Sequence, residues 1–407
     1  MSVRTSPRMA ERGPLPLAVY LLAGSLFAMG SAEFLVAGVL PAIADDLRIT
    51  LPSAGAMISA FAVGVVIGGP LLAVATLRLP RRITLVTAQV VFAASVATGL
   101  LTDHYGLILV TRFVSGLAYA GFWAAAAVTA IGLVTPERTA RASGVVVSGL
   151  SLAMIAGGPA SALLSHFTGW RGGFWAVVAL TAVGAVATLV AVPETRAGGK
   201  PGVRRELRTM ARPQLWLVYG VTLLSTAAYM VSYNYLAAFL TDATGVPAVW
   251  VPPILTVFGI GAFLGLSAGG RIADKRPFHA LLGGAVGIGV TSVLLAVLAD
   301  RAPAVAALVL LLGVAGFVLN PAIYGRVFTI AAEAPTLAGA TAVSAFQLGI
   351  SLVPLFAGAA LGAGAGIASI PWIGAGLALV TALAVLLDRT VALRGGQGEQ
   401  QPTQKTS

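Results

Sequence analysis

Long apolar runs alternate with short polar breaks along this 407-residue chain. Each run is roughly 20 to 30 residues long, which is enough for an α-helix to cross a lipid bilayer. Charged side chains, proline and glycine mark the breaks. The pattern therefore predicts an all-α membrane protein with twelve transmembrane helices, over residues 15–40, 52–76, 83–101, 105–133, 140–165, 172–192, 215–240, 249–270, 278–299, 303–330, 337–362 and 368–388.

The widest polar break runs from Glu194 to Pro213 and divides the runs into two sets of six. We interpret residues 194–213 as a cytoplasmic linker between an N-terminal half (1–193) and a C-terminal half (214–390), because the break is strongly basic. Residues 391–407 are polar and poor in apolar side chains, so we expect a disordered cytoplasmic tail. The basic residues of the linker are Arg196, Lys200, Arg204, Arg205, Arg208 and Arg212.

An internal repeat relates the two halves. A shift of 197 residues aligns the second run of one half, and the loop after it, with the corresponding part of the other half. Phenylalanine and proline match in the same register as the glycines, so chance alignment of abundant glycines is a poor explanation for the repeat. The sequence therefore predicts two pseudo-symmetric six-helix halves. The aligned pairs are Phe61 with Phe258, Gly64 with Gly261, Gly68 with Gly265 and Pro80 with Pro277.

Composition agrees with an integral membrane protein. The chain is 58% hydrophobic and only 10% charged, with a mean hydropathy of +0.94, whereas soluble domains carry about 25% charged residues. It contains no cysteine, which excludes disulfides and thiolate chemistry. His104, His166 and His279 stand singly, without the spacing of a metal site. We therefore expect neither a metal nor a cofactor.

The net charge of +11 could suggest a nucleic-acid partner, but its distribution argues against one. With a cytoplasmic N-terminus, twenty basic residues fall in predicted cytoplasmic segments and three, Arg48, Arg171 and Arg301, in outer ones. This bias predicts a multi-pass protein of the cell membrane with both termini in the cytoplasm. The first apolar run, 15–40, is too long for a cleaved secretory signal, so we interpret it as the first span.

Two charged residues are predicted inside the membrane at the same depth. Glu33 is the one charged residue of the run 15–40, and it lies about seven residues from the outer end. Arg112 lies equally far from the outer end of the fourth run. At 1.5 Å per residue both are roughly 10 Å below the surface, so we expect them to interact. Because arginine stays charged, Glu33 would be the member that binds and releases protons. The alternatives are a carboxylate neutralised for helix packing and an arginine that braces backbone carbonyls.

Arg112 and the fifth run lie in stretches that resemble known motifs. The segment LVTRFVSGLAYAG from Leu109 resembles motif B of major facilitator transporters, whose arginine corresponds to Arg112. The fifth run resembles motif C, which is associated with antiporters, although Ser161 and Ala162 stand where glycines are usual. A proline there can also bend the helix, and glycines allow close helix packing. The motif C positions are Gly149, Gly157, Gly158 and Pro159.

Two basic loops resemble motif A. The loop GGRIADKRPF from Gly269 matches closely, whereas TLRLPRR from Thr76 has Leu77 where the family usually has aspartate. We interpret both loops as cytoplasmic gates and expect the first to be the weaker; the alternative is simple anchoring by positive charge. The gate residues are Arg78, Arg81 and Arg82 in the first loop, and Arg271, Asp274, Lys275 and Arg276 in the second.

Nearly the whole chain resembles the twelve-span drug:proton antiporters, and among them the actinobacterial chloramphenicol exporters. The segments that carry this resemblance are SAEFLVAGVLPAIADDL from Ser31, SAFAVGVVIGGPLLAVATLRLPRR from Ser59, GWRGGFWAVV from Gly169, GGRIADKRPF and AAEAPTLAGA from Ala331. The resemblance implies the major facilitator fold, with substrate between the halves and export by alternating access. The positions that it places at the substrate cavity are Tyr119, Phe122, Trp123, Tyr229, Tyr233, Asn234, Asn320, Phe346 and Gln347.

Other functions fit less well. An ATP-driven pump needs a GxxxxGK[ST] loop and an enzyme needs a catalytic constellation, and the sequence contains neither. A receptor without transport leaves Glu33 unexplained, and motif C disfavours an uptake symporter. The remaining alternative is a proton-coupled exporter of a sugar, a purine or nucleoside, or another metabolite. The expected partners are a small-molecule substrate, protons and the lipid bilayer, and we expect a monomer.

Overall fold

The structure is a computed structural model that describes residues 14–75, 79–135, 138–194, 208–332 and 335–398. The described residues form helices and connecting turns, with no strand among them. Twelve helices in these ranges are long and apolar enough to cross a membrane. The all-α, twelve-helix prediction is therefore confirmed, and the protein is a multi-pass membrane protein.

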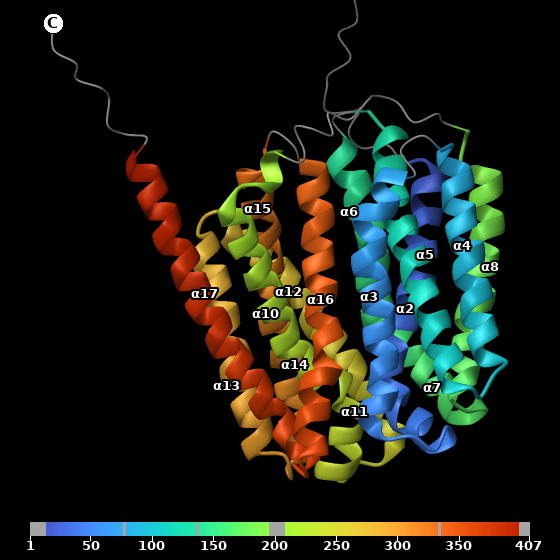
Figure 1. Ribbon diagram of the computed structural model, residues 1–407, viewed down its shortest axis with the longest axis vertical. Helices are drawn as coiled ribbons and strands as arrows, with labels where there is room; N and C mark the ends of the chain where they lie inside the picture. The colour runs from blue at the N-terminus through green and yellow to red at the C-terminus, as the bar shows by residue number, and fades with distance from the viewer. Residues whose placement is uncertain (1–13, 76–78, 136–137, 195–207, 333–334, 399–407) are drawn as a thin grey trace, which may run out of the picture. The chain divides into compact units, whose positions relative to one another are not determined.

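The chain divides into two compact units. Unit 1 comprises residues 1–200 and 247–256, and its long helices run side by side (Figure 1). In it α2 packs against α6, η3, α7 and α8, while α5 packs against α3 and α4. The elements of residues 1–200 are α2 (Leu17–Asp46), α3 (Leu51–Ala75), α4 (Arg81–Leu100), α5 (Tyr105–Gly132), α6 (Thr139–Leu152), η3 (Ala153–Gly157), α7 (Gly158–Thr168) and α8 (Trp170–Ala191).

Unit 2 comprises residues 201–246 and 257–407. Its α10 packs against α16 and α17, and α13 packs against α14 and α17. The last helix continues into the stretch for which the sequence predicts a disordered tail. The remaining elements of the chain are α10 (Pro213–Asn234), α11 (Leu236–Ala238), η4 (Phe239–Ala243), η5 (Ala248–Trp250), α12 (Val251–Ala273), α13 (Pro277–Val297), α14 (Ala302–Val318), α15 (Asn320–Ile330), α16 (Pro335–Gly362), η6 (Ile367–Ser369) and α17 (Ile370–Gly398).

The internal repeat reappears as the same helix contact within each unit. A methyl group at Gly116 of α5 would overlap the carbonyl oxygen of Phe61 in α3. In unit 2 a methyl group at Gly313 of α14 would overlap the carbonyl oxygen of Phe258 in α12. Both the two glycines and the two phenylalanines are 197 positions apart. Glycine is required at these crossings because the two backbones touch there.

Two of the interrupted spans have a proline just after the break. The fifth contains a π-helical turn, η3, directly before Pro159 at the start of α7. The tenth is divided at Leu319, just before Pro321 in the first turn of α15. Proline lacks the amide hydrogen that continues an α-helix, and its ring crowds the preceding turn. Each break therefore has a local cause in the sequence.

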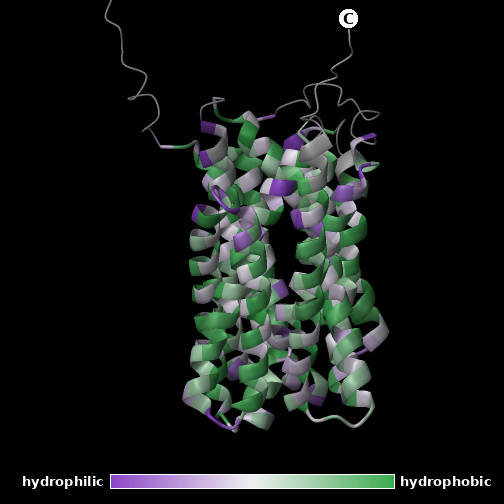
Figure 2. Ribbon diagram, turned by 90° about the vertical axis from the view of Figure 1, so that its left-hand side faces the viewer, coloured by the Kyte–Doolittle hydropathy of each residue, from purple (hydrophilic) through white to green (hydrophobic). Residues whose placement is uncertain are grey.

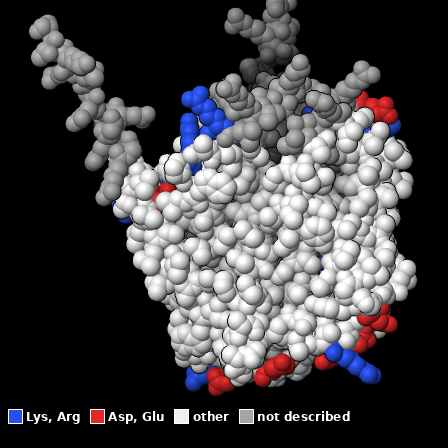
Figure 3. Space-filling view, in the orientation of Figure 1, with Lys and Arg blue, Asp and Glu red and all other residues white. Residues whose placement is uncertain are grey.

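The surfaces of the helices suit a lipid environment. Apolar residues cover most of their length in Figure 2, and hydrophilic residues gather near their ends. On the face that Figure 3 shows, Lys, Arg, Asp and Glu lie near the helix ends and leave a nearly uncharged band between them. Large apolar side chains such as Val190 and Leu387 are exposed. In a bilayer these side chains would face acyl chains, which are equally apolar. Burying them inside the protein would therefore bring no hydrophobic gain.

Candidate functional site

Glu33 and Arg112 interact inside unit 1. Glu33 lies on α2 and Arg112 on α5, and the two side chains attract each other electrostatically. Arg112 is only 5% exposed, and Oε1 of Glu33 is inaccessible to solvent. The structure thus brings together the two residues for which the sequence predicts equal depth. Their role in proton coupling stays a prediction.

Aromatic rings hold the Arg112 guanidinium. Its central carbon lies 4.8 Å from the ring centre of Phe61 and 5.8 Å from that of Phe174. These distances allow cation–π attraction, which strengthens where the cation is desolvated. Nε of Arg112 also donates to the carbonyl oxygen of Met57, at a long 3.4 Å. Such a hydrogen bond is weak, so the backbone brace expected as an alternative accounts for only part of this environment.

The helix crossing explains why Phe61 lies beneath Arg112. Arg112 lies one turn before Gly116, the residue at which α5 touches the Phe61 carbonyl of α3. Side chains on a helix lean toward its N-terminus. The glycine contact therefore brings the ring of Phe61 within reach of the guanidinium one turn earlier.

The motif C residues pack on the turn of α2 that carries Glu33. A methyl group at Gly157 would overlap the hydroxyl of Ser31, and one at Gly158 would lie 2.7 Å from Cβ of Phe34. A methyl group at Gly149, farther along, would overlap the carbonyl oxygen of Ala23. The fifth span therefore touches α2 on both sides of Glu33, and a change of bend at η3 must move one helix against the other. Pro159 is buried at the start of α7.

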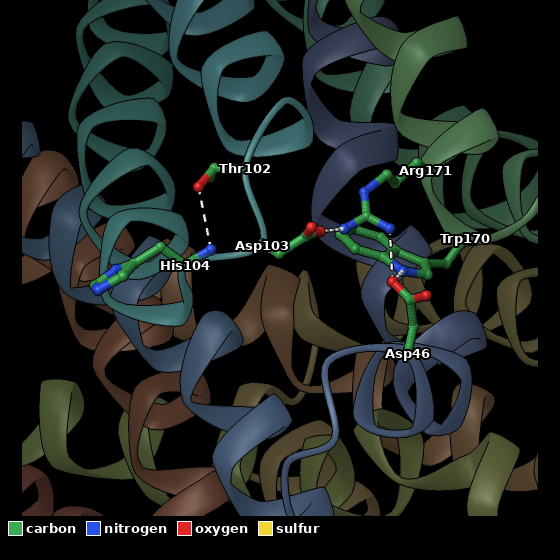
Figure 4. Close-up of polar contacts among 6 residues, drawn as sticks. All are labelled: Asp46, Thr102, Asp103, His104, Trp170 and Arg171. Atoms are coloured by element: carbon green, nitrogen blue, oxygen red, sulfur yellow. Dashed lines mark hydrogen bonds and ion pairs between the residues drawn. The ribbon is translucent and has the colours of Figure 1, made fainter.

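A polar cluster ties together one end of unit 1. Arg171 donates to Asp46 at 2.6 Å and to Asp103 at 2.6 Å, and the indole of Trp170 donates to Asp46 at 2.8 Å. Figure 4 shows Arg171 lying between the two carboxylates. We call these four residues the Arg171 cluster. Gly169, with a φ of 77°, makes the turn that places Trp170 and Arg171 at the start of α8.

Three predicted cavity residues lie on α5, farther along the helix than Arg112. The ring of Tyr119 is 5.5 Å from that of Phe61 and 6.5 Å from that of Trp123. Phe122 is fully buried, and Trp123 is partly exposed. A continuous row of aromatic rings therefore leads from Arg112 along α5. Contact of these rings with substrate stays a prediction.

In unit 2 the predicted tyrosines join an aromatic cluster. Tyr233 lies 4.3 Å from Phe258 between ring centres, and Tyr229 lies 5.3 Å from Phe317. Both tyrosines are fully buried. The residue 197 positions after Glu33 is Met230 of α10, which is also buried. Unit 2 therefore does not repeat the carboxylate of unit 1 at this position.

The remaining predicted cavity residues of unit 2 fall into two groups. Asn234 and Gln347 are buried, and Nδ2 of Asn234 and Oε1 of Gln347 form no hydrogen bond within the described part of the chain. Asn320, the first residue of α15, and Phe346 are partly exposed. Buried amides without partners favour a polar ligand group or water nearby, so these positions remain substrate candidates.

The predicted gate residues lie at helix ends. Arg82 forms an ion pair with Glu194, just after α8, and Arg81 is partly exposed beside it. Arg78 lies outside the described residues. The second loop is exposed, and Asp274 makes no ion pair there within the described ranges. Glu194 thus gives the first loop a carboxylate partner, which the loop lacks in its own sequence because Leu77 stands where aspartate is usual. Sequence reasoning missed Glu194. The other exposed gate residues are Arg271, Lys275 and Arg276.

A buried ion pair in unit 2 also escaped sequence reasoning. Arg326 of α15 binds Asp388 of α17 through two contacts of 2.6 Å, and its guanidinium lies 4.5 Å from the ring centre of Phe278. Asp388 is 1% exposed. The signal for this pair in the sequence was Asp388 itself, an acidic residue at the end of the twelfth apolar run. This pair ties together α13, α15 and α17 in unit 2.

Together these features define a class of protein. Twelve membrane-length helices, a contact repeated in each unit and a charged pair within an apolar interior are typical of a membrane transporter. Among the described residues, no three acidic or histidine side chains come together in a group that could hold a metal ion. The chain belongs to the Major Facilitator Superfamily, whose sequence profile matches residues 22–354. It is therefore a transport protein and not an enzyme.

Individual relatives and a solved structure agree with this assignment. The chain is 38% identical to a chloramphenicol resistance protein of Streptomyces lividans over 93% of this chain and 97% of the relative. It is 28% identical to a chloramphenicol efflux pump of Mycobacterium tuberculosis over 96% of this chain and 91% of that pump. The crystal structure of the nucleoside transporter NupG matches with a TM-score of 0.73 at 14% identity, covering 91% of this chain and 99% of NupG. At that identity, the match supports the fold alone.

Proposed function

We propose that this protein is a proton-coupled exporter of small, largely uncharged amphiphilic compounds, with chloramphenicol-like antibiotics as the first candidates. The attraction between Glu33, which is partly exposed, and the buried Arg112 is the observation that carries proton coupling. The names of the Streptomyces and Mycobacterium relatives support export of a phenicol. The aromatic residues predicted at the cavity, with few amides among them, suit such a ligand.

In this mechanism the charge of Glu33 is the switch. While Glu33 is ionised, it attracts Arg112, whose guanidinium is fixed by Phe61 and Phe174. Protonation removes that attraction, so α2 is held less tightly to α5. Because the glycines of motif C touch α2 beside Glu33, a shift of α2 is passed to the fifth span. Drug and proton would then exchange places as the substrate site opens alternately to the two sides of the membrane.

The proposal includes the placement of the protein in the cell. The protein would lie in the cell membrane as a monomer, with both termini in the cytoplasm, as the distribution of arginine and lysine favours. The Arg171 cluster would then face outward. The ion pair of Arg82 with Glu194 and the loop around Asp274 would face the cytoplasm and act as gates. Opposite charges at helix ends can hold one arrangement of such gates and release another.

Expression in a host that lacks its own drug pumps tests the proposal. Chloramphenicol tolerance should rise, and the gain should vanish when the proton gradient is collapsed. Drug-dependent proton flux in inverted vesicles should then be compared for chloramphenicol, a sugar and a purine. Proton flux with the sugar or purine alone would reject the phenicol assignment and favour a metabolite exporter. Unchanged tolerance from a well-expressed, membrane-inserted protein would also reject it.

A further inference from the structure

A small cavity lies beside Arg112 within unit 1. Its volume is about 20 Å³, enough for one water molecule. Four helices of the unit contribute its walls, and Arg112 is the charged residue among the lining side chains. The cavity is lined by Met57 of α3, Val96 of α4, Thr111 and Arg112 of α5, and Trp170 and Phe174 of α8, among others.

Arg112 presents an unused donor in this region. Its Nη1 is buried and forms no hydrogen bond within the described part of the chain, although Nε donates to the Met57 carbonyl. A buried donor on a charged group is costly to leave without an acceptor. Water fits both the chemistry and the size: it can accept from Nη1 and donate to a second lone pair of the Met57 carbonyl. A larger anion would exceed the volume.

Trp170 connects this cavity with the solvent-exposed end of the unit. Its ring lines the cavity and is 5% exposed, while its indole N–H reaches Asp46 of the Arg171 cluster. The guanidinium of Arg171 stacks on the same ring at 4.4 Å. Its other partner, Asp103, is 89% exposed, and Asp46 is 46% exposed. The ring is therefore held in place by groups that water reaches freely.

We infer that this cavity is a water site for Arg112 and that the Trp170 ring is its lid, which gives solvent an entry to the Glu33–Arg112 pair through unit 1 itself. The entry begins at the Arg171 cluster, on the side that we propose is outside. Its use in proton supply rests on the proposed function, but hydration of the cavity does not. The entry is separate from the residues predicted to contact substrate.

Cysteine accessibility tests the water site directly, because the natural chain contains no cysteine. Val96→Cys places a thiol on the cavity wall, and Val177→Cys is its matched control, since Val177 is 1% exposed on α8 and does not line the cavity. Radiolytic footprinting, in which bound water yields hydroxyl radicals that oxidise an adjacent thiol, is applied to the full-length protein in proteoliposomes. Val96→Cys should react and Val177→Cys should not. Equal rates for the two positions would overturn the water site.

The lid is tested in the same assay. Trp170→Phe keeps a ring but removes the hydrogen bond to Asp46, and the loss of one bond to a charged group should raise the Val96→Cys rate about tenfold. Asp46→Asn weakens the same tie from the other side and should act in the same direction. Trp175→Phe is the matched control, because Trp175 is 41% exposed on the same helix. If neither lid variant raises the Val96→Cys rate, or if the control raises it equally, Trp170 is not the lid. Labelling needs no transport, so it remains informative if proton coupling fails.

Discussion

Gly157→Ala should disturb the contact between the fifth span and α2 and thereby impair transport. A methyl group there would overlap Ser31 Oγ and lie 2.9 Å from Ser31 Cβ and 3.1 Å from a ring carbon of Phe27. Real methyl groups do not tolerate such crowding, so α2 or η3 must shift. Ser31 is two residues from Glu33, and the shift would alter how Glu33 meets Arg112.

The magnitude follows from comparison with Gly144→Ala on α6. Nothing lies within 4 Å of a methyl group at Gly144. Both substitutions gain similar helix propensity, about 1 kcal/mol, so the difference between them isolates the overlap. Overpacking of this kind costs about 1–3 kcal/mol. Gly157→Ala should therefore be less stable than Gly144→Ala by that amount.

Thermal unfolding of the purified variants, together with drug export by cells, measures both consequences. Gly157→Ala should unfold earlier than Gly144→Ala and export less, whereas Gly144→Ala should unfold slightly later than the natural protein and export normally. Adding Ser31→Gly should recover part of the loss, with a coupling of about 0.5–3 kcal/mol as expected for residues in contact. Equal stability of the two alanine variants, or no coupling to Ser31, would refute the described packing.

The remaining predictions concern the other charged residues. Asp388→Asn leaves Arg326 without its buried partner and should cost about 3–5 kcal/mol of stability in thermal unfolding; full stability would show that the pair is not buried as described. Asp274→Asn, at an exposed position, should change stability by less than about 0.5 kcal/mol. It should nevertheless slow transport while leaving drug affinity intact, and weakened binding with normal turnover would place Asp274 at the substrate instead.

The main elements of the fold could be predicted because hydropathy decides which segments enter the membrane. The depth of Glu33 and Arg112 followed from helical rise alone, and the structure shows them interacting. The 197-residue repeat was visible in Gly64 and Gly261 because backbones that touch admit no other residue.

Other features depend on tertiary structure and could not be predicted. Arg82 and Glu194 are 112 positions apart, and Arg171 and Asp46 are 125 apart, so only the packing of α8 reveals their partners. The same sequence pattern can place an aromatic residue of an interior helix at a cavity or in a packed core. Tyr229 and Tyr233, predicted at the cavity, pack on Phe317 and Phe258.

Drug-driven proton movement by Glu33→Gln tests the central claim most directly. Glutamine keeps the size and the hydrogen-bonding groups of this side chain but fixes the neutral state. In inverted vesicles loaded with a pH dye, the natural protein should couple chloramphenicol transport to proton flux. Glu33→Gln should still bind chloramphenicol, yet produce neither coupled proton flux nor accumulation against a gradient. Uphill export by Glu33→Gln at the normal rate, with normal proton flux, would contradict the account.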